Sequence, residues 1–238
     1  MQRKAIGILG GMGPEASVYM YRMLIELSFL KFNAKNNDHF PEIVLDSVPV
    51  PDFISNDKNK NKALKMLKGR TRNFSSSSTL CLSIACNTAH VLIEELQQTT
   101  EVPFISMIDE VTQAVFLARC QRAGIIATPS TIRFGLYQKA LEKKGIDFVV
   151  PSVEEIKKME QVIRNVIRGK QLKNDTTTLF NIANGLRMRG ADCIILGCTE
   201  IPLVFPKKYS LPVFNSVEIL SLSLLRKYYK SHKMSLQI

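Results

Sequence analysis

The stretch Ile84-Ala85-Cys86-Asn87-Thr88-Ala89-His90 decides the fold, because it places a thiol where an apolar run ends. Residues 80–85 are apolar enough for a buried strand, and residues 91–96 form an amphipathic segment that indicates a helix. We therefore expect a strand to deliver Cys86 to the first turn of a helix. Backbone N–H groups at a helix N-terminus favour negative charge, so this position predicts a lowered thiol pKa.

A second stretch repeats this construction. Ile194-Ile195-Leu196-Gly197-Cys198-Thr199-Glu200 is again an apolar run followed by a cysteine and a threonine. Cys81 and Cys86 recur as Cys193 and Cys198, each 112 residues later. The repeat predicts two copies of one unit, with two thiols facing one site.

Strands and helices alternate along the whole chain. Strands are expected at 5–9, 42–48, 80–85, 101–106, 123–127, 148–151, 193–197 and 211–216. This alternation predicts an α/β fold of two pseudo-symmetric domains, each a parallel sheet flanked by helices. Ligands bind at the carboxyl ends of parallel strands, so the active site is expected in the cleft between the domains.

The repeat also suggests domain boundaries. We expect a first α/β domain at 1–103 plus 213–238, which carries Cys86. The second would span 104–212 and carry Cys198. A chain of 238 residues is long enough for two domains of about 100 residues each.

Composition narrows the class of protein. The chain is 45% hydrophobic but has no run of about 18 apolar residues, so no transmembrane helix is expected. The apolar run 6–11 is too short for a signal peptide, and an odd count of five cysteines is typical of reduced thiols. We therefore expect a cytoplasmic protein without a membrane partner. No cysteine pair has C-x-x-C spacing and the three histidines are scattered, so no metal site is expected.

The formal net charge of +11 raises the question of nucleic acid. Basic residues gather at 58–68 and 226–233, without interleaved aromatic residues or a known nucleic-acid motif. A solvated surface is the favoured interpretation, and no nucleic-acid partner is expected.

Glycines follow the first strand. The segment 11–16 matches G-x-G-x-x-A, but Asp46 comes 30 residues after Ala16, too far for the acidic residue of a dinucleotide site. A turn for a small anion is the preferred interpretation.

Four motifs together resemble the aspartate/glutamate racemase family, most closely its aspartate racemase branch. They are the segments 10–16 (GGMGPEA), 48–52 (VPVPD), 85–90 (ACNTAH) and 196–201 (LGCTEI). The resemblance implies amino-acid racemisation without pyridoxal phosphate or another cofactor. It also implies an active site between two α/β domains, a final helix packed on the first domain, and commonly a homodimer.

The residues suit this chemistry. Racemisation removes a proton from one face of Cα and returns one to the other, so two acid/base groups are needed. Cys86 and Cys198 are the predicted catalytic pair, which would titrate jointly. Small polar residues near the turns are predicted to bind the substrate together with the first turn: Gly11, Met12, Asn87, Thr88, Ser130, Thr131, Thr199 and Glu200.

The sequence departs from the family at the end of the proline loop. Many relatives carry an arginine after the Pro-Asp pair, whereas this chain has Phe53. An acidic substrate needs a fixed cation, because an unpaired buried carboxylate is costly. Arg133 follows the Ser130-Thr131 turn and is the predicted replacement, so we expect activity toward aspartate or glutamate.

The sequence departs from the family at two further places, and other functions are compatible with it. The last strand ends in Asn215-Ser216 where relatives have an aspartate, and serines fill 75–78. A maleate isomerase or hydantoin racemase is possible on the same scaffold. A non-catalytic two-domain binding protein is a further alternative, but a binder would need neither cysteine.

Overall fold

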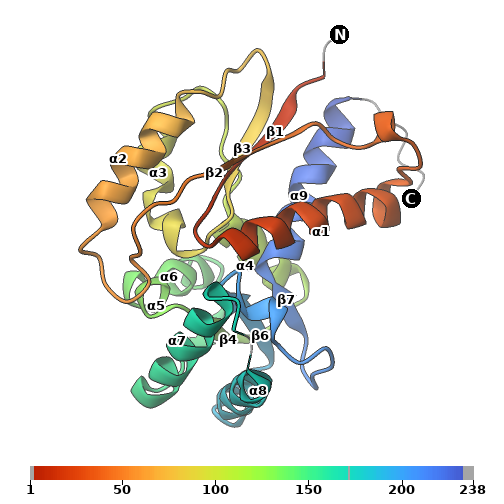
Figure 1. The fold of residues 1–238 in the computed structure, drawn as a ribbon. Coiled ribbons are helices and arrows are strands. Elements are labelled where there is room, and N and C mark those ends of the chain that lie inside the picture. The colour runs from red at the N-terminus through yellow and green to blue at the C-terminus, as the bar shows by residue number, and fades with distance from the viewer. Residues whose placement is uncertain (1–2, 171, 233–238) are drawn as a thin grey trace.

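Two parallel sheets organise the computed structural model, which describes residues 3–170 and 172–232 (Figure 1). The first has the order β2-β1-β3, from Ile43–Ser47, Ala5–Gly10 and Thr79–Ile84. The second has the order β5-β4-β6-β7, from Asp147–Val149, Arg122–Ala127, Cys193–Gly197 and Val213–Asn215. The shared order around β1 and β4 confirms the predicted pseudo-symmetric α/β fold.

Helices cover both faces of the first sheet, so every residue of its central strand, β1, is buried. Ile6 and Ile8 pack against α1 (Pro14–Phe32) and α9 (Ser216–Ser231). Leu9 points to the opposite face, where α2 (Lys60–Thr71) and α3 (Ile93–Gln97) cover the sheet (Figure 1). A 3-10 turn, Asn37–His39, lies between α1 and β2.

The second sheet is built in the same way. On one face lie α4 (Met107–Leu117), α5 (Pro129–Phe134) and α6 (Leu136–Glu142). On the other lie α7 (Val153–Ile167), which starts at a capping box on Ser152, and α8 (Lys173–Met188). None of the helices in the described ranges is long and apolar enough to span a bilayer.

The segments behind the two thiols differ from the expected helices. Thr88–Leu92 is a 3-10 helix that precedes the short α3, and Ile201–Leu203 is a single 3-10 turn. The expected strand at 101–106 is reduced to one bridge between Leu82 and Phe104. Pro103 has no N–H to donate there, which limits the strand pairing.

The last strand belongs to the second sheet, whereas the last helix packs against the first helix. β7 hydrogen-bonds to β6, so residues 213–215 lie in the second sheet and not with the first domain. α9 then packs against α1, as the resemblance implies, and the Tyr229 hydroxyl donates to the His39 carbonyl. We keep the division into two domains as a proposal, with the last boundary moved behind Asn215.

Candidate active site

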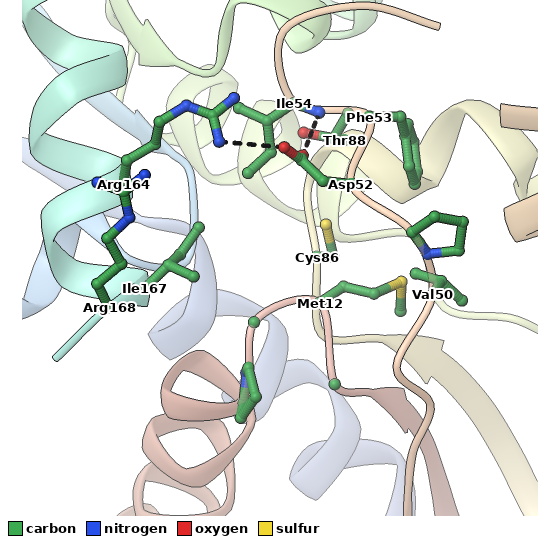
Figure 2. A pocket seen from close by; sticks show the side chains of 14 residues that line it. Met12, Val50, Asp52, Phe53, Ile54, Cys86, Thr88, Arg164, Ile167 and Arg168 are labelled. Atoms are coloured by element: carbon green, nitrogen blue, oxygen red, sulfur yellow. Dashed lines mark hydrogen bonds and ion pairs between the residues drawn. The ribbon is translucent and has the colours of Figure 1, made fainter. Parts of the chain in front are cut away.

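A pocket of about 270 Å³ opens where the first sheet ends. Figure 2 shows the Cys86 sulfur with Arg164, Ile167 and Arg168 on one side and Met12 and Val50 on the other. The lining comes from the first turn, the proline loop, the Cys86 turn and the end of α7: Gly11, Met12, Gly13, Pro14, Val50, Pro51, Asp52, Phe53, Ile54, Cys86, Thr88, Arg164, Ile167 and Arg168.

Cys86 follows β3 and faces this pocket, although its side chain is only 9% exposed. Backbone N–H groups of Thr88 and Ala89 hydrogen-bond to the sulfur and favour the thiolate. Burial outweighs them and, together with the charge of Glu200, raises the pKa of the Cys86 thiol to about 12.

Cys198 follows β6 and is tied to a buried carboxylate. Its Sγ donates to Glu200 Oε2 at 3.0 Å, and the Thr199 hydroxyl donates to the same oxygen at 3.0 Å. The other oxygen, Oε1, accepts from the Gly13 N–H at 3.2 Å. Glu200 therefore links the Cys198 turn to the first glycine turn, which lines the pocket.

Both thiols lie in the field of this carboxylate. Burial raises the pKa of Cys198 well above its usual value, with Glu200 as the next cause and Cys86 as a smaller one. Glu200 is also the charge that raises the pKa of Cys86. The two cysteines are therefore electrostatically coupled around one carboxylate.

The expectation of lowered thiol pKa values is wrong for the free protein. It assumed the N-terminus of a regular helix, but short 3-10 segments follow both cysteines. Few aligned peptide dipoles act on each sulfur, so desolvation dominates.

Gly11 and Met12 lie where the sequence places them, in the pocket wall. Gly11 has φ of 87°, and a Cβ on it would lie 2.6 Å from the Val48 backbone. Only glycine fits there, because the proline loop passes directly against the turn.

Three threonines connect the two halves beside Cys86. Thr88 Oγ1 lies 2.8 Å from Thr128 Oγ1 and 3.0 Å from Thr131 Oγ1. Thr128 also caps α5 by accepting from the Thr131 N–H. Of these three, only Thr88 lines the pocket, so the others orient it from behind.

Three other predicted binding residues have their side chains engaged outside the lining. Asn87 accepts from the Tyr137 hydroxyl and donates to Ser216 Oγ at 3.1 Å. Ser130 Oγ accepts from Arg133, and Thr199 donates to Glu200. These contacts favour positioning roles.

Arg133 does not line the pocket. Its guanidinium donates to the Ser55 carbonyl at 3.0 Å and to Ser130 Oγ at 3.1 Å. Two arginines that the sequence analysis missed, Arg164 and Arg168, supply the cationic wall. They lie four residues apart at the end of α7, a spacing that also suits a solvated helix face.

The two arginines differ in their partners. Arg164 pairs with Asp52 Oδ2 at 3.1 Å and with Glu160 Oε1 at 2.8 Å. Arg168 is exposed, and its side chain makes no ion pair or hydrogen bond within residues 3–170 and 172–232. Arg168 is therefore available to a ligand.

His90 holds the Cys86 turn from behind. Its Nε2 accepts from the Met107 N–H at 2.9 Å, so Nδ1 carries the proton and donates to the Cys86 carbonyl at 2.8 Å. Burial, the dominant cause, lowers the pKa of His90 to about 4. The neutral ring links the Cys86 turn to the start of α4.

This link makes stability depend on pH. The unfolded chain protonates His90 near 6.5 and the folded chain only near 4, so stability falls as pH drops through this window. The loss should approach about 3 kcal/mol. In urea unfolding from pH 7 to 4, His90→Gln should show a smaller pH slope than the wild type. His39→Gln is the control, and an unchanged slope in His90→Gln would contradict the assignment.

Cys86 and Cys198 lie at the carboxyl ends of strands in two parallel sheets, and both interact with the carboxylate of Glu200 beside a pocket. Such a site is able to transfer protons. Comparisons with known proteins point to a family that uses this chemistry. Residues 9–222 match the family described as Asp/Glu/Hydantoin racemase. The chain belongs to this family, whose amino-acid racemases are isomerases.

Individual relatives cover nearly the whole chain. The broad specificity amino-acid racemase RacX of Bacillus subtilis (strain 168) is 25% identical over 224 residues, 94% of this chain and 97% of the relative. The structure of Picrophilus torridus aspartate racemase superposes with a TM-score of 0.82 and 26% identity, over 98% of this chain and 96% of that one. An aspartate racemase homologue from Pyrococcus horikoshii OT3 gives 0.79 and 29%, over 94% and 99%.

Proposed function

We propose that the protein racemises an acidic amino acid, aspartate or glutamate, by proton transfer between Cys86 and Cys198 without a cofactor. The observation that carries this proposal is the coupling of both thiols to Glu200 at the ends of the two sheets. Family membership supports the same reaction.

The reaction needs one thiolate and one thiol. The thiolate takes the Cα proton from one face, and the opposite thiol gives its proton to the other face. The charge that develops on the substrate carboxylate needs donors, which backbone N–H groups of the glycine and Cys86 turns can supply. The return reaction exchanges the roles of the two sulfurs.

The raised thiol pKa values require an activating event. The substrate brings an ammonium group, and a cation close to a thiol favours its ionised form. We infer that substrate binding converts one thiol to the thiolate and that the free protein keeps both protonated. This arrangement would limit reaction of the free thiols with other electrophiles.

Arg168 is the proposed partner of the substrate's side-chain carboxylate. It lines the pocket and has no internal ion pair among the described residues, whereas Arg164 is held by two carboxylates. Arg168→Gln should raise KM for the acidic substrate about 10- to 100-fold, as expected for one lost charge-assisted hydrogen bond. Arg133→Gln, outside the pocket, is the matched control. Equal KM changes in both variants would exclude Arg168.

A broad specificity is the second candidate. Phe53 is buried and lines the pocket together with Val50, Ile54 and, from the opposite side, Ile167, and these apolar side chains suit an uncharged substrate side chain. RacX, with its printed broad specificity, is consistent with this alternative. Preferred turnover of an apolar amino acid would decide for it.

A homodimer and a cytoplasmic location are part of the proposal. α1 carries four large apolar side chains that are about half-exposed: Val18, Tyr21, Phe29 and Leu30. If this face forms the dimer, light scattering should give twice the chain mass for the wild type and the single mass for Phe29→Asp. Met188→Asp, which replaces an exposed side chain at the end of α8, should remain dimeric. A dimeric Phe29→Asp would place the interface elsewhere.

The function is tested with a panel of L-amino acids and purified protein, dialysed without pyridoxal phosphate. Chiral chromatography should detect the D-isomer of aspartate or glutamate. No racemisation of any amino acid in the panel would contradict the proposal.

A further inference from the structure

A second cluster of titratable side chains lies at the opposite edge of the second sheet. Cys120 precedes β4, and Asp192 and Cys193 lie at the start of β6. The two sulfurs and a carboxylate oxygen of Asp192 all lie within 4.8 Å of one another. β4 and β6 are parallel neighbours, with Ala123 paired to Cys193, so their amino ends meet here. Cys198 lies at the other end of β6, so this cluster is separate from the candidate active site.

The carboxylate of Asp192 is held in a fixed orientation. Its Oδ2 accepts from the Gln121 N–H at 2.6 Å, and its Oδ1 accepts from the Arg122 N–H at 3.2 Å. Each carboxylate oxygen has a further lone pair for another partner. Carboxylates that bind metals are commonly oriented by hydrogen bonds of this kind.

The cluster is reached from outside. A cavity of about 460 Å³ borders Cys120, whose side chain is 8% exposed, whereas Cys193 is fully buried. Residues of α4, its exit and the turn before β5 line this cavity: Phe116, Leu117, Arg119, Cys120, Gln121, Lys144, Gly145 and Ile146. An ion could enter there, and a water molecule could complete its coordination.

We propose that Cys120, Asp192 and Cys193 form a binding site for a thiophilic divalent cation of the Zn²⁺ type. Two thiolates and one carboxylate are ligands that Zn²⁺ prefers, and water supplies the fourth position of a tetrahedron. Binding would release the two thiol protons to solvent. The ion would tie the start of β4 to the start of β6, a structural role independent of racemisation.

No sequence motif indicates this metal site. Cys120 and Asp192 are 72 positions apart, and neither cysteine belongs to a C-x-x-C pair. The expectation of no metal site rested on that spacing. Tertiary pairing of two parallel strands brings the three ligands together instead.

Cobalt is a suitable probe, because Co²⁺ replaces Zn²⁺ and absorbs light when thiolates bind it. Chelator-treated, reduced protein titrated with Co²⁺ should develop thiolate charge-transfer and tetrahedral d–d bands that saturate at one equivalent. Zn²⁺ should abolish these bands and raise the melting temperature. Cys120→Ser, at the cavity edge, and Asp192→Asn should lose most of the absorption and of the temperature shift.

Two controls separate this site from other thiols. Cys81→Ser replaces a buried strand cysteine outside the cluster, and Cys86→Ser tests the pocket. Both should keep the cobalt spectrum. The proposal is overturned if the intact protein does not bind Co²⁺, if Cys120→Ser keeps the spectrum, or if Cys86→Ser loses it. A disulfide between Cys120 and Cys193 in a protein that binds no metal would assign the pair to redox chemistry instead.

Discussion

Replacing Cys198 with alanine is expected to lower the racemisation rate about 10³-fold, because one of two proton carriers is lost. Cys86→Ala should have an effect of the same order. Neither change removes much buried volume, so circular dichroism and urea unfolding should show folded proteins. The rate of D-isomer formation from the L-substrate, followed by chiral chromatography, measures the loss.

The two variants should also differ from each other. Each keeps one thiol, which faces only one side of Cα. In deuterated water one variant should exchange the Cα proton of the L-isomer and the other that of the D-isomer. This exchange should be slow, because the remaining thiol must trade its proton with solvent while the substrate stays deprotonated. Cys81→Ala is the matched control, because it removes a buried thiol from β3 outside the pocket. Full racemisation by either single variant would contradict the two-thiol mechanism.

Glu200→Gln is expected to cause the second largest loss, about 10²-fold in kcat. The amide can keep the contact with the Gly13 N–H but removes the negative charge and the acceptor of the Cys198 proton. That charge raises the pKa of both thiols. Without it the pKa of both thiols falls, and the Cys198 thiol loses the carboxylate oxygen that accepts its hydrogen bond and orients it.

The sign of this effect can be measured. In Glu200→Gln, alkylation of the thiols by iodoacetamide should begin at lower pH than in the wild type, and the pH profile of kcat/KM should move in the same direction. Thr199→Val removes the neighbouring hydroxyl without a charge and should move both curves much less. An alkylation profile displaced to higher pH would show that Glu200 does not control the thiols.

Much of the fold could be predicted because its signals are local. Buried strands such as 80–85 and 193–197 are short apolar runs, and the repeated Cys-Thr turns reveal the internal symmetry. Residues 213–215, expected in the first domain, pair with β6 in the second sheet, and a strand at such a boundary gives no local sign of its neighbour.

The site was harder to predict for a related reason. Gly11, Met12, Cys86 and Thr88 are adjacent to strand ends, so topology alone brings them to the pocket. Arg168 reaches it from the far end of a helix, which periodicity does not report. The sign of the thiol pKa shifts was missed because burial and a neighbouring carboxylate are tertiary effects.

Isotope incorporation during the first few per cent of reaction tests the central claim most directly. The protein is incubated with L-aspartate or L-glutamate in deuterated water, and the two enantiomers are separated and analysed by mass spectrometry. A thiol carries a single proton. The thiol that takes the Cα hydrogen of the L-substrate can therefore return only that hydrogen to the same face of Cα. The second thiol, which has exchanged with the solvent, delivers deuterium to the opposite face and so forms the D-product. We predict deuterium at Cα of the D-product and almost none in the remaining L-substrate. Equal early labelling of both enantiomers would show that one base serves both faces and would contradict the account.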